Sequence, residues 1–198
     1  MPVSPNSIIN LSAASVLLVE PTNQGMDILS QICFGFGVRS PHRCFSAADA
    51  QEFLAKIPVD LIICEAELQD KGGYELIRWL RRSELDPNAK TSTVLISGHT
   101  PLRNVIHGRD CGANAVVVKP LTPKILLDRI IWLAADKRDF VQSETYAGPD
   151  RRWRNLGPPP GTAGRRRNDL SASVGQAIDP NLEQSDIDAM FRPTKVAI

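Results

Sequence analysis

The sequence predicts a doubly wound α/β sandwich, in which helices cover both faces of a parallel sheet. Between residues 15 and 136, short apolar runs alternate with segments whose apolar residues recur at helical spacing. Runs that are almost wholly apolar are typical of strands buried on both faces of a sheet. Strands that alternate with helices are typical of parallel α/β folds.

Each expected strand is short. The apolar runs are VLLVE (16–20), DLIIC (60–64), TVLIS (93–97) and AVVVK (115–119), with a weaker strand around residues 43–45. Ser46 can cap a helix over the following residues, and further helices are expected around residues 74–80 and 125–133. In such sheets, ligand chemistry collects at the carboxyl ends of the strands.

Four regions follow from the change in composition along the chain. We expect an N-terminal extension (1–14), the α/β domain (15–136), an arginine-rich segment (137–177) and a tail (178–198). After Phe140 the segment lacks apolar periodicity, so it cannot offset its ordering entropy and is predicted to be disordered when free. In the tail, a short amphipathic helix can run from Asp179-Pro180 through Phe191, with Ile187, Met190 and Phe191 on one face.

Several functional classes are excluded by composition and motifs. The net charge is only +1, and we find neither a hydrolytic arrangement of side chains nor a spaced set of metal ligands. We therefore expect no enzyme activity, no catalytic residues and no metal site. No signal peptide and no apolar run of membrane-spanning length is visible, so we expect a cytoplasmic protein. The four cysteines lack CxxC spacing and are expected to be buried, reduced thiols.

The α/β domain resembles the response-regulator receiver family. The resemblance is carried by VLLVE, by DLIIC followed by Glu65, by the serine that ends TVLIS, and by GANAVVVKP. It implies a CheY-like, flavodoxin-like sheet of five parallel strands in the order 2-1-3-4-5 with five helices. It also implies a phosphoacceptor site at the strand ends and a cis peptide bond at Lys119-Pro120.

Carried over to this sequence, the family's phosphoacceptor site is altered. The acidic pair after the first strand becomes Glu20 and Pro21, and the acceptor aspartate becomes Glu65. The hydroxyl and lysine positions are retained, and the aromatic switch position corresponds to a valine. The residues of this degenerate site are Glu20, Glu65, Ser97 and Lys119, and the switch position is Val116.

Phosphoryl transfer is not expected at the altered site. The reaction needs a carboxylate in line with the donor and Mg²⁺ to neutralise the developing charge. A glutamate is one methylene longer, which displaces the nucleophile, and one metal-supporting carboxylate is missing. Two alternatives remain for Glu65: it mimics a charged acceptor by pairing with Lys119, or the site is a relic whose residues satisfy one another.

The arginine-rich segment has the chemistry of a nucleotide site. Six arginines and no lysine lie between residues 148 and 169. Guanidinium groups bind phosphate or guanine O6/N7 with two parallel bonds and stack on bases, as aromatic rings do. A carboxylate can accept hydrogen bonds from guanine N1–H and N2–H. The candidate residues are Asp150, Arg151, Arg152, Trp153, Arg154, Arg165, Arg166, Arg167, Asn168 and Asp169.

A receiver-like domain followed by GPDRRWRNLGPPPGTAGRRRND resembles the Cle family of CheY-like cyclic di-GMP effectors. The resemblance implies that the segment binds cyclic di-GMP as an intercalated dimer, without Mg²⁺, and folds on binding. It further implies a bacterial cytoplasmic protein that engages the flagellar motor switch protein when ligand-bound, tuning motility and surface attachment. No specific DNA binding is expected.

Two other functions remain open: a phosphorylation-dependent response regulator, and a general nucleic-acid binder that contacts phosphates through its basic segment. The terminal segment EQSDIDAMF resembles the CheY-binding N-terminus of the flagellar switch protein. It either docks on the receiver-like domain and covers its partner face, or forms an ordinary short amphipathic helix or frayed tail.

Overall fold

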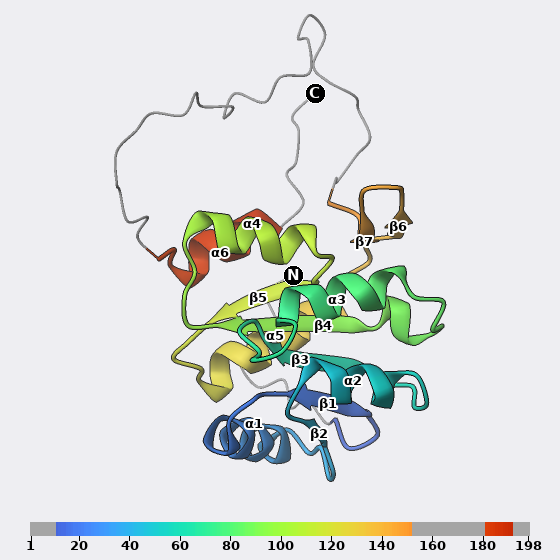
Figure 1. Ribbon diagram of the computed structural model, residues 1–198. Coiled ribbons are helices and arrows are strands. Elements are labelled where there is room, and N and C mark those ends of the chain that lie inside the picture. Colours follow the sequence, from blue (N-terminus) through green and yellow to red (C-terminus); the bar gives the residue numbers. More distant parts are fainter. Residues whose placement is uncertain (1–10, 152–180, 192–198) are drawn as a thin grey trace, which may run out of the picture.

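Five parallel strands form the central sheet. The computed structural model describes residues 11–151 and 181–191. The strands are β1 (Val16–Val19), β2 (His42–Cys44), β3 (Leu61–Glu65), β4 (Ser92–Ser97) and β5 (Ala115–Val118). Their order is β2-β1-β3-β4-β5, and every neighbouring pair is parallel (Figure 1). The predicted fold class and strand order are confirmed, and all five carboxyl ends lie at one edge of the sheet.

The sheet is buried on both faces, and alternate residues of each strand enter different hydrophobic clusters. Leu17, Val19 and Ile62 belong to the cluster beneath α2, α3 and α4. Leu18 and Ile63 belong to the cluster beneath α1 and α5. Because successive strand side chains point to opposite faces, two covered faces require an apolar residue at nearly every position.

One helix follows each strand of the sheet: α1 (Asn23–Gly35), α2 (Ala47–Leu54), α3 (Gly73–Arg82), α4 (Leu102–Asp110) and α5 (Pro123–Ala134). The 3₁₀ turn η1 (Asn88–Lys90) precedes β4. Hydroxyl groups of Thr22, Ser46 and Thr122 cap α1, α2 and α5 by accepting a backbone N–H of the first turn. The predicted Ser46 cap is confirmed, with a distance of 3.0 Å from Asp49 N to Ser46 Oγ.

The prediction that residues 137–177 are disordered is wrong for the first part of that range. An antiparallel hairpin of β6 (Phe140–Gln142) and β7 (Ala147–Pro149) packs against α3 (Figure 1). The Tyr146 ring is buried, and its hydroxyl donates to Pro149 O at 2.7 Å. The hairpin packs on the hydrophobic surface of the α/β domain instead of forming a core of its own, which local composition does not reveal. Residues 152–177 lie outside the described part of the chain.

A close backbone approach joins this hairpin to the domain. Gly112 has a positive φ of 95°, and a Cβ placed there would lie 2.4 Å from Ala147 O. Gly148, with φ at 152°, faces it: a Cβ there would lie 2.8 Å from the Gly112 Cα. Two glycines in contact therefore allow the hairpin to lie against the end of α4.

Arg81 of α3 is fully buried beneath the hairpin. Its guanidinium donates five hydrogen bonds of 2.8–2.9 Å, and all five acceptors are neutral oxygens. The acceptors are Gly112 O, Ala89 O, Thr91 O, Thr93 Oγ1 and Asn114 Oδ1. Burial lowers the pKa of Arg81 to about 10, so the group stays charged at neutral pH. It ties α3, η1, β4 and the loop before β5 together.

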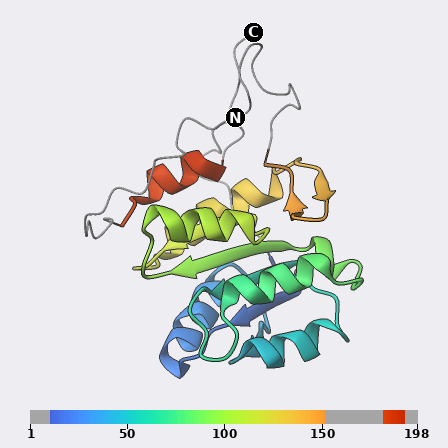
Figure 2. The same ribbon diagram turned by 45° about the horizontal axis from the view of Figure 1, so that its top comes forward.

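The C-terminal helix α6 (Gln184–Phe191) lies alongside α4 and over β5 (Figures 1 and 2). Ile187 and Phe191 are buried and Met190 is partly buried, as the predicted apolar face requires. The helix begins at Gln184, after Asp179-Pro180. The tail thus forms a short amphipathic helix that packs on the domain rather than a frayed end, and the covering of a partner face stays a prediction.

Three further features of the described residues bear on expectations from the sequence: the cysteines, the length and polarity of the helices, and one peptide bond. All four cysteines are free and buried, and burial raises the pKa of Cys33 to about 11 and that of Cys111 to about 12. Within residues 11–151 and 181–191, every helix is too short or too polar to span a bilayer. The Lys119-Pro120 peptide bond is cis, as the family resemblance implied.

Candidate functional site

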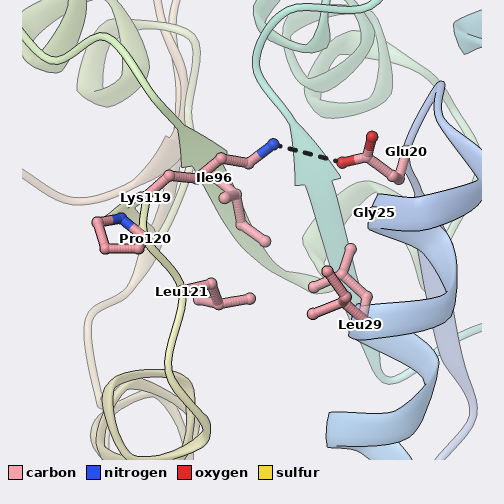
Figure 3. Close-up of a pocket in the computed structure, with 8 residues that line it drawn as sticks. Glu20, Gly25, Leu29, Ile96, Lys119, Pro120 and Leu121 are labelled. Atoms are coloured by element: carbon pink, nitrogen blue, oxygen red, sulfur yellow. Dashed lines mark ion pairs between the residues drawn. The ribbon is translucent and has the colours of Figure 1, made fainter.

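Three strand-end residues predicted from the sequence meet at one point. Glu20 follows β1, Glu65 ends β3 and Lys119 follows β5, so the parallel strand order brings them to the same edge of the sheet. Lys119 Nζ lies 2.6 Å from Glu65 Oε2 and 3.6 Å from Glu20 Oε2. Figure 3 shows the lysine reaching toward Glu20 across the end of the sheet. We call these three residues the Glu–Lys cluster.

The Glu–Lys cluster contains two carboxylates and one ammonium group. Glu20 and Glu65 are almost wholly buried, while the Lys119 side chain is 41% exposed. Burial raises the pKa of Glu65 above its ordinary value of 4.5, against the opposing hydrogen bond and charge of Lys119. Burial alone would lower the pKa of Lys119, but the hydrogen bond and charge of Glu65 and the charge of Glu20 outweigh it and raise that pKa. A single ammonium group thus forms ion pairs with two buried carboxylates.

Glu20 also holds the first turn of α1. Its Oε1 accepts hydrogen bonds from Thr22 Oγ1 at 2.7 Å and from Thr22 N at 3.1 Å, and Thr22 caps the helix. A Cβ at Gly25 would lie 2.4 Å from Glu20 Cδ, so a larger residue at this position would displace the Glu20 carboxylate. Glu20 therefore has a structural role in addition to its place beside Lys119.

Ser97 lies at the end of β4, at the same sheet edge, but its hydroxyl is engaged in the following turn. Ser97 Oγ donates to His99 O at 2.8 Å and accepts from His99 N at 3.2 Å. A pocket of about 290 Å³ adjoins the cluster and has mostly apolar walls (Figure 3). It is lined by Glu20, Gly25, Ile28, Leu29, Ile96, Lys119, Pro120 and Leu121.

Of the predicted nucleotide-binding residues, the structure describes Asp150 and Arg151. The Arg151 guanidinium carbon lies 3.9 Å from the centroid of the Tyr146 ring, and Arg151 forms an ion pair with Asp110 at the end of α4. Asp150 continues from β7, and its N–H donates to Asp139 O at 2.7 Å. The other eight residues lie outside the described part of the chain: Arg152, Trp153, Arg154, Arg165, Arg166, Arg167, Asn168 and Asp169.

The two contact residues of Arg151, Asp110 and Tyr146, differ in how far the sequence indicates them. Asp110 is separated from Arg151 by the whole of β5, α5 and the hairpin, and nothing in the sequence pairs it with a later arginine. Tyr146 precedes the arginines closely enough to be noticed, but its burial depends on the hairpin. Together they hold the first arginine of the segment against the domain.

No group of three or more His, Cys, Asp or Glu side chains suited to a metal ion occurs within residues 11–151 and 181–191. The predicted site residues that the structure describes belong to the Glu–Lys cluster, to the turn after β4 that holds Ser97, and to the Asp110–Arg151–Tyr146 contact with the adjoining Asp150. The Glu–Lys cluster and the Asp110–Arg151–Tyr146 contact are the two charged arrangements among them. They lie at different places in the fold, one at the carboxyl edge of the sheet and the other at the C-terminal end of α4.

Comparison with known proteins identifies the domain. The response regulator receiver domain matches residues 16–131. The transcriptional regulatory protein AruR of Pseudomonas aeruginosa is 36% identical over 95 residues, which are 48% of this chain and 35% of AruR. TorR, the TorCAD operon transcriptional regulatory protein of Escherichia coli O157:H7, is 30% identical over 107 residues, 51% of this chain and 44% of TorR. The chain thus spans less than half the length of either relative.

Solved structures show the same fold. The receiver domain of a histidine kinase from Syntrophus aciditrophicus superposes with a TM-score of 0.56 at 23% identity, covering 67% of this chain and 99% of that one. The chemotaxis protein CheY4 of Vibrio cholerae superposes with a TM-score of 0.55 at 20% identity, covering 60% and 97%. The solved structures share the fold, and the family match supports a role in signal transduction. The chain belongs to the response regulator receiver family.

Proposed function

We propose that this protein is a cyclic di-GMP effector whose arginine-rich segment binds the second messenger beside the receiver domain. The placement of Arg151 carries the proposal. The first arginine of the segment is stacked on the buried Tyr146 ring and paired with Asp110, so the segment leaves the domain from a fixed point. An anionic ligand bound by the following arginines would therefore be held against the domain surface.

The chemistry of the segment fits a guanine dinucleotide. Its six arginines and two aspartates provide donors for phosphates and for the Hoogsteen edge, and acceptors for the Watson–Crick edge. An intercalated dimer of cyclic di-GMP carries four phosphate charges, which balance this excess of arginine. Ordering the segment on binding opposes the interaction and reduces the free energy of binding by about 2–5 kcal/mol.

In this proposal the nucleotide replaces phosphorylation as the input. Glu65 stands at the acceptor position, is 5% exposed, and has its carboxylate paired with Lys119. Mg²⁺, which phosphoryl transfer in this family requires, does not fit the residues present. The Lys119 ammonium already neutralises Glu65 and contacts Glu20, and Pro21 supplies no further carboxylate.

Calorimetric titration of the intact protein with cyclic di-GMP tests whether the protein binds this nucleotide. We expect heat of binding that ATP does not reproduce and that short duplex DNA does not compete away. Arg151→Ala should weaken binding at least tenfold, because a charged hydrogen bond contributes about 1.5–3 kcal/mol. Arg39→Ala, an exposed arginine elsewhere on the domain, is the matched control and should bind normally. Absence of heat, or equal heat with ATP, contradicts the proposal.

The phosphorylation alternative is tested separately with acetyl phosphate and intact-mass spectrometry. We expect no mass increase equal to a phosphoryl group, with or without Mg²⁺; a stoichiometric increase would favour a phosphorylation-dependent regulator instead. The output, engagement of the flagellar motor switch protein in the bacterial cytoplasm, is tested by interferometry with the purified switch protein. Binding should rise when cyclic di-GMP is added.

A further inference from the structure

A pocket of about 290 Å³ opens beside the Glu–Lys cluster, between the first turns of α1 and the loop that follows β5. Its walls are mostly apolar, and Figure 3 shows Leu29 and Leu121 pointing toward each other across it. Ile28 also lines the pocket, although that side chain is 46% exposed. These apolar side chains therefore face a space that no side chain of residues 11–151 or 181–191 fills.

The pocket has one polar end, formed by Glu20 and Lys119. Glu20 lines the pocket and is only 3% exposed, so its carboxylate is shielded from bulk water. Its Oε1 accepts two hydrogen bonds from Thr22, whereas its Oε2 lies 3.6 Å from Lys119 Nζ, which is longer than an ordinary hydrogen bond. Buried polar atoms normally have a hydrogen-bond partner. Glu20 Oε2 is thus an acceptor with room for a further donor at the end of an apolar pocket.

The charge at this end of the pocket favours a cation. The Glu–Lys cluster has two negative charges and one positive charge, which leaves a net charge of −1. Lys119 Nζ lies 2.6 Å from Glu65 Oε2, so the lysine pairs mainly with Glu65 and compensates Glu20 only in part. A second ammonium group would complete the neutralisation, whereas an anionic ligand would add to the excess of negative charge. A charged hydrogen bond in such a partly buried place is stronger than one in water.

The size of the pocket limits the ligand to a small molecule. Pockets for drug-sized ligands have volumes of about 300–1,000 Å³, and an apolar cavity of about 150 Å³ is enough for benzene. This pocket therefore accommodates one aromatic ring with a short alkyl chain. One N–H of an ammonium group can donate to Glu20 Oε2 while the others stay hydrated, because the Lys119 side chain at the same end is 41% exposed. A bare metal ion fits less well, since it needs several oxygen ligands and these walls are mostly apolar.

We propose that this pocket binds a small primary amine in its ammonium form, with the ammonium group on Glu20 and an apolar body between Leu29 and Leu121. The ligand class is an arylalkyl or branched alkyl ammonium ion. Because Glu20 also holds the first turn of α1 through Thr22, the ligand contacts the residue that joins this helix to the strand ends. The inference goes beyond nucleotide binding, and nothing in it depends on which ligand the arginine-rich segment binds.

Amide NMR titration of the full-length protein with phenethylammonium chloride tests this at neutral pH without any nucleotide. We expect saturable shifts at amides of residues that line the pocket, among them Gly25, Leu29 and Leu121. Two ligands of similar size are the controls: phenethyl alcohol, which has no charge, and phenylacetate, which has the opposite charge. Both should bind about tenfold more weakly or worse, because neither can donate a charged hydrogen bond to Glu20.

Two substitutions should change the affinity in opposite directions. Glu20→Gln keeps the shape of the side chain and an acceptor for Thr22 but removes the charge, so the ammonium ion should bind about tenfold more weakly and no better than the alcohol. Lys119→Met removes the competing cation, so the ammonium ion should bind about two- to fivefold more tightly. Glu52→Gln, the same substitution at a carboxylate on α2 that is 74% exposed, is the matched control and should bind as the wild type does.

Equal affinity for the ammonium ion and the alcohol would overturn the inference, as would tighter binding of phenylacetate, an absence of saturable shifts, or shifts confined to amides outside the pocket. A Glu20→Gln variant that melts cooperatively and still binds the ammonium ion as the wild type does would also overturn it. If Glu20→Gln does not fold, the Lys119→Met variant decides the question, because unchanged or weaker affinity there would exclude Glu20 as the group that binds the ammonium ion.

Discussion

Replacing Lys119 with methionine removes the cation that lies between two buried carboxylates while keeping the length of the side chain. Removing one partner of a buried ion pair costs about 3–5 kcal/mol, whereas an exposed pair contributes about 1 kcal/mol or less. The Glu65 side chain is 6% exposed and that of Lys119 is 41% exposed, so water screens one partner and hardly reaches the other. We expect Lys119→Met to lower the free energy of unfolding by about 2 kcal/mol at neutral pH.

The loss should depend on pH in a defined direction. Burial already raises the pKa of Glu65 above 4.5 against the effect of Lys119, so removing the lysine raises it further. A carboxyl group whose pKa is higher in the folded than in the unfolded protein has no effect on stability at a pH below its unfolded pKa. As the pH rises through the folded pKa, that group lowers the free energy of unfolding. The difference between Lys119→Met and the wild type should therefore be small near pH 4.5 and should grow toward neutral pH.

Urea denaturation followed by tryptophan fluorescence measures the difference at several pH values. Glu65→Gln combined with Lys119→Met should recover most of the lost stability, because the uncompensated charge is removed with its partner. Lys124→Met, at a lysine that is 83% exposed, is the matched control and should change stability by less than about 0.5 kcal/mol. A loss from Lys119→Met that is equally large near pH 4.5 and at neutral pH would refute the reasoning.

Two further substitutions probe the contacts beneath and beside the hairpin. Arg81→Lys leaves several of five buried acceptors without a donor, so thermal denaturation should show that the free energy of unfolding falls by about 3 kcal/mol or more. A fall of less than about 1 kcal/mol would contradict the hydrogen-bond network. Asp110→Ala removes one of the two contacts that hold Arg151 against the domain, so calorimetry should show a two- to fivefold loss of cyclic di-GMP affinity, the range of a surface ion pair. A gain in affinity would mean that Asp110 competes for Arg151 rather than positioning it.

Parts of the candidate site follow from the order of residues along the chain. Glu20, Glu65 and Lys119 each stand at the end of an apolar run, and a parallel sheet brings such positions to one edge. The identity of these residues was therefore predictable, and so was a pairing of Glu65 with Lys119. The distances were not, because they depend on the packing of α1: the room left at Gly25 and the hydrogen bonds from Thr22 decide where the Glu20 carboxylate lies.

The hairpin shows where reasoning from composition fails. Residues 140–149 have too few apolar residues to form a core of their own, and local composition therefore predicts disorder. In the structure, Tyr146 buries its ring against the receiver domain, and the contact between Gly112 and Gly148 allows the close approach. The free energy of ordering this segment comes from a surface more than thirty residues earlier in the chain, which no window of local sequence contains.

The sequence alone determined the α/β class, the strand order implied by the receiver resemblance, and the charged residues at the strand ends, because periodicity and residue type are local properties. Only the tertiary structure decided that one lysine serves two buried carboxylates, that Arg151 rests between Tyr146 and Asp110, and that α6 covers the edge of β5. Each of these contacts joins segments distant along the chain, and its free energy depends on burial and geometry that arise only when the sheet and its helices have assembled.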